Sequence, residues 1–578
     1  MKHMGARHAA VFIFMVHILA STTVAQQIGG TITGRVMTED GQPIPHAIVS
    51  IFGVSGRTNQ TTVTRETTTN DNGEFVADGL ESIPYVISAW SPGYVPATQG
   101  TVLNPFELSE QLFIHVGERV TVRLNRGGVI TGRVTNDARE AVIGIPVKAI
   151  RIRDETERLI ITDATSAHLW TRTTDDRGVY RIYGLAPGSY IVAAGGRDAS
   201  SGRPSPFAGR VTTYHPSSTR DAATVVEVSS GIESTGIDIR YRGERGFAVS
   251  GKINVASVTN PRVTQAPLMI VLRSPTNGET IDTISQPIKN QNSYAFYGVP
   301  NGDYEVIASN ADMHIQAPRR FTVKDADVTG VDLALLPNAT ISGLVAVAKA
   351  NSEALECKNQ RELHLEDIIV RFRRDESEEK RGDLLPIFPG YGVGIPDDKG
   401  VFTLSDLKPG RHRIELQLPA ETWYVKALTV ADLKPTIDPR NGLTVKSGDR
   451  LSGLRITIAE GAATLKGQVT LAEQTKLPTR LHVHLIPAEA DALEDILRFA
   501  ETNVDANGAF TVTNLAPGKY FLLARAIPGL ASADKLMRPV AWDPSERKKL
   551  RKEAEAANLA IELKSCQQIT GYELRLTK

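Results

Sequence analysis

One short sequence pattern recurs five times along this chain, and it restricts the fold more than any other feature. Each copy has a Gly or Asn, an aromatic residue two positions later and an apolar residue seven positions later, and four copies add a Tyr twelve positions later. The copies start near Asp71, Asp175, Gln291, Asp397 and Asp505. Copies that lie roughly 100 residues apart indicate a series of small domains and not one large enzyme core.

The second half of each copy is predicted to be a hairpin followed by a half-buried strand. Its turn needs a residue that tolerates positive φ, and the residues there are Gly73, Gly178, Asn292, Gly400 and Gly508. The next strand alternates apolar and polar residues, which is typical of a sheet packed on one face, as in a sandwich. Its buried face begins with Tyr85, Tyr190, Tyr304 and Tyr520, and with His412 in the fourth copy.

Each copy opens with another short strand, in which apolar residues lie two positions before and two positions after a Gly. These strands are expected at 32–36, 130–134, 249–253, 341–345 and 465–469. The Gly faces inward in this pattern, so we expect a neighbouring backbone or aromatic ring to approach it closely.

The repeats divide the chain into five predicted domains. Their expected limits are 26–128, 129–246, 247–338, 339–461 with a charged insertion, and 462–578 with helical insertions. Connections of about six to ten residues between neighbouring units restrict swinging, so the sequence predicts a semi-rigid rod. Two helices are expected in the last repeat: 488–501, from its apolar spacing, and 543–557, which begins with Asp543, Pro544 and a Glu at the capping-box position.

The pattern G-x-V, a D-x-x-G turn and L-x-P-G-x-Y-x-V-x-A resembles the carboxypeptidase regulatory-like domain. It is clearest from Gly34 to Ala89 and from Gly132 to Ala194. This resemblance implies transthyretin-like (prealbumin-like) sandwiches, related to the carbohydrate-binding-like fold group, in exported bacterial proteins. The fold class is therefore predicted as all-β: a tandem array of five antiparallel, transthyretin-like or Ig-like β-sandwiches, with one or two short helices in the last repeat. The resemblance implies no activity, because the matching residues occupy turn and core positions.

Composition and the N-terminus indicate an exported protein that does not bind nucleic acid. Lys plus Arg and Asp plus Glu are equal at 65 each, whereas nucleic-acid binding needs a basic surface. A basic start, the apolar run 9–20 and the small residues before Gln26 predict a signal peptide over 1–25. An uncleaved anchor is the alternative, but the apolar run is too short to span a bilayer. We expect the mature chain to have no transmembrane segment and to be periplasmic or extracellular.

Three histidine or acidic patterns could suggest metal sites, and each has a structural explanation. His115 and Glu118 have the spacing of a zinc carboxypeptidase motif, but they lie at a tight turn without the large domain that such a site needs. His482 and His484 alternate on a strand and lack a third ligand nearby in the sequence. The Asp-rich turns lack a full calcium ligand series. The Arg-Gly-Asp tripeptide at 381–383 is interpreted as a chance match to a cell-adhesion tripeptide, in a charged run that is expected to be a solvated loop. No catalytic residue, metal or cofactor is predicted.

A few aromatic residues outside the repeat pattern are candidates for ligand binding. Trp90, Tyr94, Trp170 and Trp423 could stack on sugar rings, or they could pack at domain junctions. Only two cysteines occur, Cys357 and Cys566. They could form a disulfide between the last two repeats, or they could be two buried thiols, and the sequence favours the thiols because no spacing links them.

The sequence therefore predicts a non-catalytic structural or binding protein of the cell envelope. One alternative is a carbohydrate-binding protein, which requires an exposed aromatic patch. Another is an accessory subunit of an envelope peptidase or transporter, recognised through exposed sheet edges. The partner is accordingly expected to be an envelope protein or a polysaccharide.

Overall fold

The computed structural model describes residues 30–576 except 56–59, 98–112, 155–170, 198–204, 256–266, 277–279, 288–291, 311, 349–356, 358–362, 376–392, 432–438, 471–477, 479–480, 506 and 527–538. The predicted signal peptide, the tripeptide at 381–383 and Trp170 lie outside these residues. Within them the chain consists mainly of strands, with a single α-helix, so the all-β prediction is confirmed.

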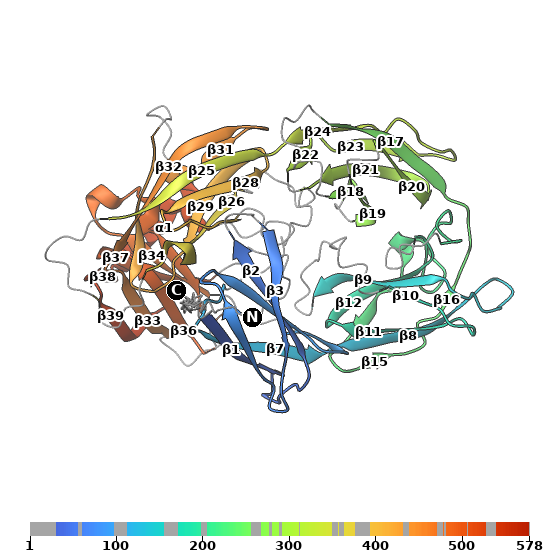
Figure 1. Ribbon diagram of the computed structural model, residues 1–578, viewed down its shortest axis with the longest axis horizontal. Helices are drawn as coiled ribbons and strands as arrows, with labels where there is room; N and C mark the ends of the chain where they lie inside the picture. The colour runs from blue at the N-terminus through green and yellow to red at the C-terminus, as the bar shows by residue number, and fades with distance from the viewer. Residues whose placement is uncertain are drawn as a thin grey trace, which may run out of the picture.

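The strands form tandem β-sandwiches (Figure 1). Five separate buried clusters form their cores, one for each repeat. Each cluster contains the aromatic residue that follows the hairpin turn: Phe75, Tyr180, Tyr294, Phe402 and Phe510. The apolar residue seven positions after the turn is buried in every repeat. The recurring pattern therefore marks core positions, as the sequence predicted.

The first two repeats each have two sheets. In repeat 1 the strand orders are β4-β1-β7-β6 and β3-β2-β5, and in repeat 2 they are β11-β8-β15 and β10-β9-β12-β13, with β16 on β8 and β14 on β12. The strands are β1 (Gly30–Met37), β2 (Ile48–Ser55), β3 (Gln60–Thr68), β4 (Glu74–Leu80), β5 (Tyr85–Trp90), β6 (Tyr94–Pro96), β7 (Arg119–Arg126), β8 (Gly128–Thr135), β9 (Pro146–Asp154), β10 (Thr171–Thr173), β11 (Val179–Leu185), β12 (Gly188–Ala194), β13 (Thr213–Tyr214), β14 (Val226–Val228), β15 (Glu233–Ser234) and β16 (Ile239–Arg240).

Repeat 3 differs because β22 pairs with both β21 and β24 and joins its strands into one continuous sheet. Repeat 4 returns to two sheets, β28-β25-β32-β30 and β27-β26-β29-β31. The strands are β17 (Phe247–Val255), β18 (Pro267–Arg273), β19 (Thr280–Pro287), β20 (Ser293–Val299), β21 (Gly302–Ser309), β22 (Met313–Ile315), β23 (Arg319–Val323), β24 (Leu333–Pro337), β25 (Ala339–Val347), β26 (Ile369–Arg374), β27 (Val393–Gly394), β28 (Val401–Leu407), β29 (Gly410–Gln417), β30 (Trp423–Val430), β31 (Leu443–Val445) and β32 (Arg450–Glu460).

Repeat 5 has the sheets β36-β33-β39 and β35-β34-β37-β38, and the helix α1 packs on the second. Its elements are β33 (Ala463–Thr470), β34 (Leu481–Pro487), β35 (Ala500–Asn503), β36 (Ala509–Leu515), β37 (Gly518–Ala526), α1 (Pro544–Ala557), β38 (Ala560–Leu563) and β39 (Gln568–Arg575). Short 3-10 helices are η2 (Arg220–Ala222), η5 (Leu365–Asp367), η8 (Pro439–Asn441), η9 (Ala490–Ala492), η10 (Ile496–Arg498) and η11 (Val540–Trp542).

The opening strand of each repeat pairs with the closing strand of the same repeat in parallel, while its other neighbour is antiparallel. This holds for β1 with β7, β8 with β15 and β16, β17 with β24, β25 with β32, and β33 with β39. The antiparallel description of the sandwiches is therefore correct for the other pairs but not for this one. An alternating pattern does not reveal whether two strands pair in parallel or antiparallel, because apolar and polar residues alternate in the same way in both arrangements.

The Gly of each opening strand lies opposite the core aromatic residue, as predicted. A Cβ atom on Gly34 would lie 2.5 Å from the ring of Phe75 and 2.5 Å from the backbone oxygen of Val120. The turn glycines also behave as predicted, because all four have φ between 72° and 86°. Asn292 adjoins Gln291, which lies outside the described residues, so its expected positive φ stays a prediction.

Short polar side chains before these turns accept hydrogen bonds from the backbone. The Oδ1 atom of Asp175 accepts hydrogen bonds from the backbone nitrogens of Arg177 (3.0 Å) and Val179 (2.7 Å). These bonds lower the pKa of Asp175, that from Val179 most strongly. Asp397 and Asp505 accept the same two bonds in repeats 4 and 5. In repeat 1 the acceptor is Asn70 and not the expected Asp71, whose carboxylate lies 3.7 Å from His46. The side chains therefore form the turns, as expected.

One of the two predicted helices exists. Asp543 caps α1 by accepting from the backbone nitrogens of Ser545 and Glu546, and Leu550 and Ala554 are buried against the sheet, as predicted. The helix expected at 488–501 is wrong. That segment forms η9, η10 and then strand β35, which completes the edge of the sheet by pairing with β34. Pairing with β34 at the edge of this sheet outweighed the helical spacing of the apolar residues in the segment.

The repeats do not form a rod. Figure 1 shows the N-terminal repeat, in blue, beside the fourth repeat, in yellow and orange, so that the chain returns on itself. The contact is a buried apolar cluster of Val86 and Phe113 from repeat 1 with Ile369, Val393 and Ile395 from repeat 4. The rod prediction is therefore wrong, because short linkers limit swinging but do not set the direction in which each repeat turns.

Candidate functional site

The three predicted aromatic candidates that the structure describes do not form one site. Trp90, at the end of β5, is 57% exposed and pairs across the sheet with Ile48, which is 38% exposed. Tyr94 on β6 is half-buried against the core of repeat 1. Trp423 is buried in the core of repeat 4, and its backbone oxygen accepts a hydrogen bond from Asn514 of repeat 5 (2.7 Å). Only Trp90 among the described candidates therefore offers an exposed ring.

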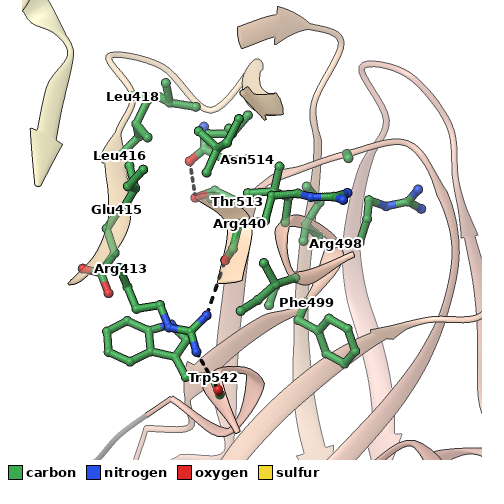
Figure 2. Close-up of a pocket in the computed structure, with 18 of the residues that line it drawn as sticks. Arg413, Glu415, Leu416, Leu418, Arg440, Arg498, Phe499, Thr513, Asn514 and Trp542 are labelled. Atoms are coloured by element: carbon green, nitrogen blue, oxygen red, sulfur yellow. Dashed lines mark hydrogen bonds between the residues drawn. The ribbon is translucent and has the colours of Figure 1, made fainter. Parts of the chain in front are cut away.

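A cavity of about 310 Å³ lies between repeats 4 and 5 (Figure 2). Repeat 4 lines it with β29 and β30, and repeat 5 lines it with residues 496–500, 513–516 and Tyr520. Trp542, which the sequence analysis did not single out, closes one side and is buried. Residues so far apart in the chain could not be grouped from the sequence.

The charged side chains around this cavity are paired within the protein. Arg413, only 2% exposed, donates to the backbone oxygens of Trp542 (2.7 Å) and Arg440 (3.4 Å) and to Asp375 (3.3 Å). Its guanidinium carbon also lies 5.5 Å from the centre of a ring of Trp542. The contacts of Arg413 with Trp542 join the two repeats, so the cavity belongs to their packing.

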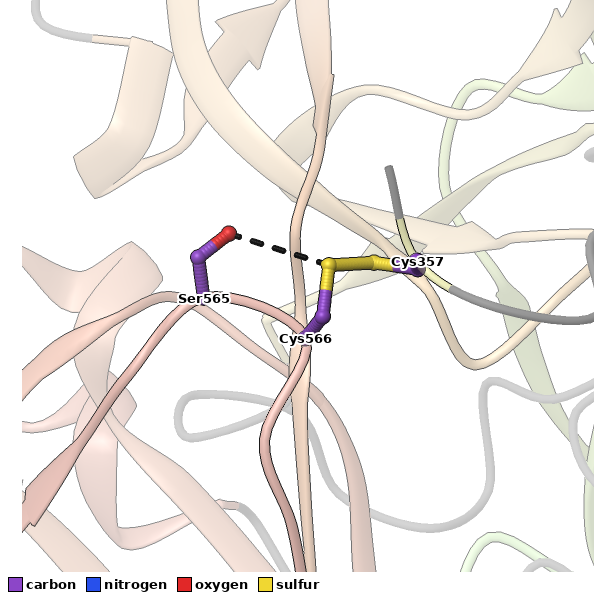
Figure 3. The surroundings of a disulfide bond; sticks show 3 residues. All are labelled: Cys357, Ser565 and Cys566. Atoms are coloured by element: carbon purple, nitrogen blue, oxygen red, sulfur yellow. Dashed lines mark hydrogen bonds between the residues drawn. A yellow bond between two sulfur atoms is a disulfide. The ribbon is translucent and has the colours of Figure 1, made fainter. Parts of the chain in front are cut away.

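The two cysteines form a disulfide between repeats 4 and 5 (Figure 3). Their Cα atoms lie 5.3 Å apart although the residues are 209 positions apart in the chain. Cys357 is buried, and Cys566 follows Ser565, whose hydroxyl lies 3.9 Å from the Cys566 sulfur. The interpretation of the cysteines as two buried thiols is therefore wrong. The disulfide forms because the fold brings the turn at Cys566 in repeat 5 beside Cys357 of repeat 4, and no sequence spacing records this proximity.

His115 and Glu118 lie at the junction of repeats 1 and 4. Gly117 makes the predicted tight turn, with φ 87°. His115 Nδ1 is 3.4 Å from a carboxylate oxygen of Glu118, and its Nε2 is 3.2 Å from the backbone oxygen of Asp367. The imidazole is buried between the two repeats. This geometry gives the H-x-x-E spacing a role in interdomain packing.

The strand histidines have an acidic neighbour that the sequence did not reveal. His482, His484 and Glu501 each place a potential ligand atom within 4.8 Å of the others. Glu501 comes from β35, in the segment predicted to be helical. Burial by itself would raise the pKa of Glu501, but the hydrogen bond and charge of His484 hold that pKa below its usual value.

Comparison with known proteins identifies one repeat. Residues 31–124 match the family model of the carboxypeptidase regulatory-like domain, so repeat 1 contains such a domain. The match covers less than half of the chain, and the resemblance of repeats 2 to 5 stays a prediction. No curated protein matches the chain in sequence. In the part of the chain that the structure describes, no helix has the length and apolarity needed to cross a membrane.

Several solved structures are distantly similar. Two B repeat units of the collagen-binding protein of Staphylococcus aureus are 12% identical, with 75% of this chain and 100% of that chain covered and a TM-score of 0.14. The minor pilin GBS52 of Streptococcus agalactiae is 13% identical, with coverages of 37% and 96% and a TM-score of 0.19. The Bacillus anthracis TIE protein is 13% identical, and this chain spans about half of it (54% and 51% covered, TM-score 0.14). Matches this distant carry no information about what the present chain binds.

Proposed function

We propose that this chain is an exported, non-catalytic protein that serves as a structural or binding module of the cell envelope. The observation that carries the proposal is the joining of the repeats by buried contacts. His115 contacts Asp367 across 252 positions of the chain, and Cys357 is bonded to Cys566. Such contacts hold the sandwiches in one arrangement, which suits a scaffold that presents a surface.

The proposal includes the division into domains at residues 128, 246, 338 and 461 and the removal of residues 1–25 on export. We would express the full chain in a Gram-negative host, fractionate the cells and sequence the N-terminus. We expect a mature chain that starts near Gln26 in the periplasm or on the surface. A chain with its N-terminus intact in the cytoplasm would refute export.

Polysaccharide binding is a second candidate function, and exposed Trp90 favours it. Its ring stands beside Ile48 on the outer face of the sheet β3-β2-β5, and Ile48 pairs in turn with Thr68 of β3. An exposed ring with hydroxyl groups nearby is the combination that stacks on a sugar ring.

A retention experiment separates the two candidates. Residues 26–578 would be incubated with insoluble peptidoglycan and polysaccharides, with soluble sugar as competitor. Saturable binding that Trp90→Ala abolishes and Val76→Ala preserves would establish glycan binding; Val76 is the matched control, because it is 59% exposed in the same repeat. Absence of retention would favour the scaffold, whose partner would then be sought by crosslinking in the envelope.

A further inference from the structure

Three side chains of repeat 5 meet on the outer face of the sheet β35-β34-β37-β38. His482 and His484 lie two positions apart on β34, so they share one face. Glu501 stands directly opposite His484 on the antiparallel neighbour β35. The strand register therefore places two imidazoles and one carboxylate together on this face.

The distances and burial of the three groups suit a metal ion. Their potential ligand atoms all lie within 4.8 Å of one another, and His484 Nδ1 is 3.5 Å from Glu501 Oε2. Ligand atoms about 2.0–2.2 Å from a tetrahedral zinc ion are themselves roughly 3.3–3.6 Å apart. The His484–Glu501 pair already has this separation, and the ligand atom of His482, which lies within 4.8 Å of both, would move closer on binding.

The surroundings hold the ligands in place. The side chain of His484 is 4% exposed, so its ring is fixed by packing, and that of Glu501 is 27% exposed. The backbone nitrogen of Val540 in η11 donates to Glu501 Oε2 (3.3 Å) and orients the carboxylate. Hydrogen bonds of this kind to a ligand are typical of metal sites.

We propose that His482, His484 and Glu501 bind one zinc ion, with a fourth position open to water or to a ligand from outside. Two imidazoles and a carboxylate form a donor set that zinc accepts. The ion would join the edge strand β35, only four residues long, to β34. The alternative is an ion pair of His484 with Glu501 that binds no metal. The proposal does not depend on the function proposed above.

The test uses untagged residues 26–578, stripped of metal with a chelator. Cobalt(II) would be added first, because a tetrahedral site with nitrogen and oxygen ligands gives visible absorption bands that zinc then displaces. We expect one cobalt ion per chain and complete displacement by one equivalent of zinc. Zinc should also raise the melting temperature, by mass action on the folded state.

Two variants and one control keep the result interpretable. Glu501→Gln and His482→Gln each remove one ligand at a position that is not fully buried, so both should fold, as circular dichroism would check. Each should weaken zinc binding at least tenfold and remove the tetrahedral bands. His46→Gln, at an exposed histidine beside Asp71 (3.7 Å), should bind as the parent does. Absence of the bands in the parent, or equal binding by folded ligand variants, would overturn the proposal.

Discussion

The imidazole Nε2 of His412 lies 2.8 Å from the backbone oxygen of Lys408, four residues earlier. The other four repeats have a Tyr at this position, and each phenol donates to the oxygen four residues earlier at 2.7–3.0 Å. Repeat 4 therefore keeps the contact with a different donor, the Nε2–H tautomer of histidine. In all five repeats this position supplies a hydrogen-bond donor to the backbone oxygen four residues earlier, and a phenol is one way to supply it.

The His412 contact predicts a pH dependence that the tyrosine repeats lack. Burial lowers the pKa of His412 to about 4, although the bond to Lys408 opposes the shift. The unfolded residue has a pKa of about 6.5. Between these values the unfolded chain binds a proton that the native chain excludes. The free energy of unfolding of repeat 4 should therefore fall as the pH drops from about 6.5 to about 4, by roughly 3 kcal/mol in all.

Urea denaturation of the mature chain at several pH values would measure this loss. His412→Tyr restores the donor found in the other repeats and does not titrate in that range, so its stability should depend less steeply on pH. An identical pH dependence in parent and variant would show that other groups are responsible.

Removing one phenol tests the same contact in repeat 2. Tyr190 is buried, and its hydroxyl is 2.7 Å from the backbone oxygen of Ala186. Tyr190→Phe leaves that oxygen without its partner and should cost about 1–2 kcal/mol in the free energy of unfolding. Tyr297→Phe, at a ring that is 60% exposed, should change it little. Equal effects in the two variants would contradict the prediction.

The disulfide should stabilise the last two repeats. Cross-linking residues 209 positions apart restricts the unfolded chain strongly. A disulfide that closes such a loop adds roughly 2–5 kcal/mol to the free energy of unfolding. Reductant, or the double substitution Cys357→Ser and Cys566→Ser, should lower the denaturation midpoint of these repeats. Thiol titration of the denatured, unreduced protein is the direct check, and two free thiols per chain would show that the bond does not form.

The contact between repeats 1 and 4 can be opened without disturbing either main core. Phe113 is 4% exposed, and the guanidinium carbon of Arg371 lies 5.1 Å from its ring centre. Phe113→Ala should remove roughly 3–5 kcal/mol from this contact and increase the radius of gyration in small-angle X-ray scattering. Val76→Ala, on the exposed surface of repeat 1, is the control. A parent chain that already scatters as an extended rod would contradict the closed arrangement.

Local signals in the sequence predicted the repeats well. The turn glycines, the core aromatic residues and the cap of α1 depend on neighbours within a few positions, and all are where the pattern placed them. The helix expected at 488–501 failed because β34 offers that segment strand pairing. This error also concealed Glu501, which no spacing connects to His484 until both strands lie side by side.

The sequence by itself determined the sandwich of each repeat, because alternation, turn residues and inward glycines act over a few residues. Only the tertiary structure decided how the sandwiches are arranged. It placed His115 on Asp367, joined Cys357 to Cys566 and set Glu501 beside His484. Each of these contacts depends on the direction in which whole sheets turn or pair, and that direction is the sum of many weak contacts that no short pattern records.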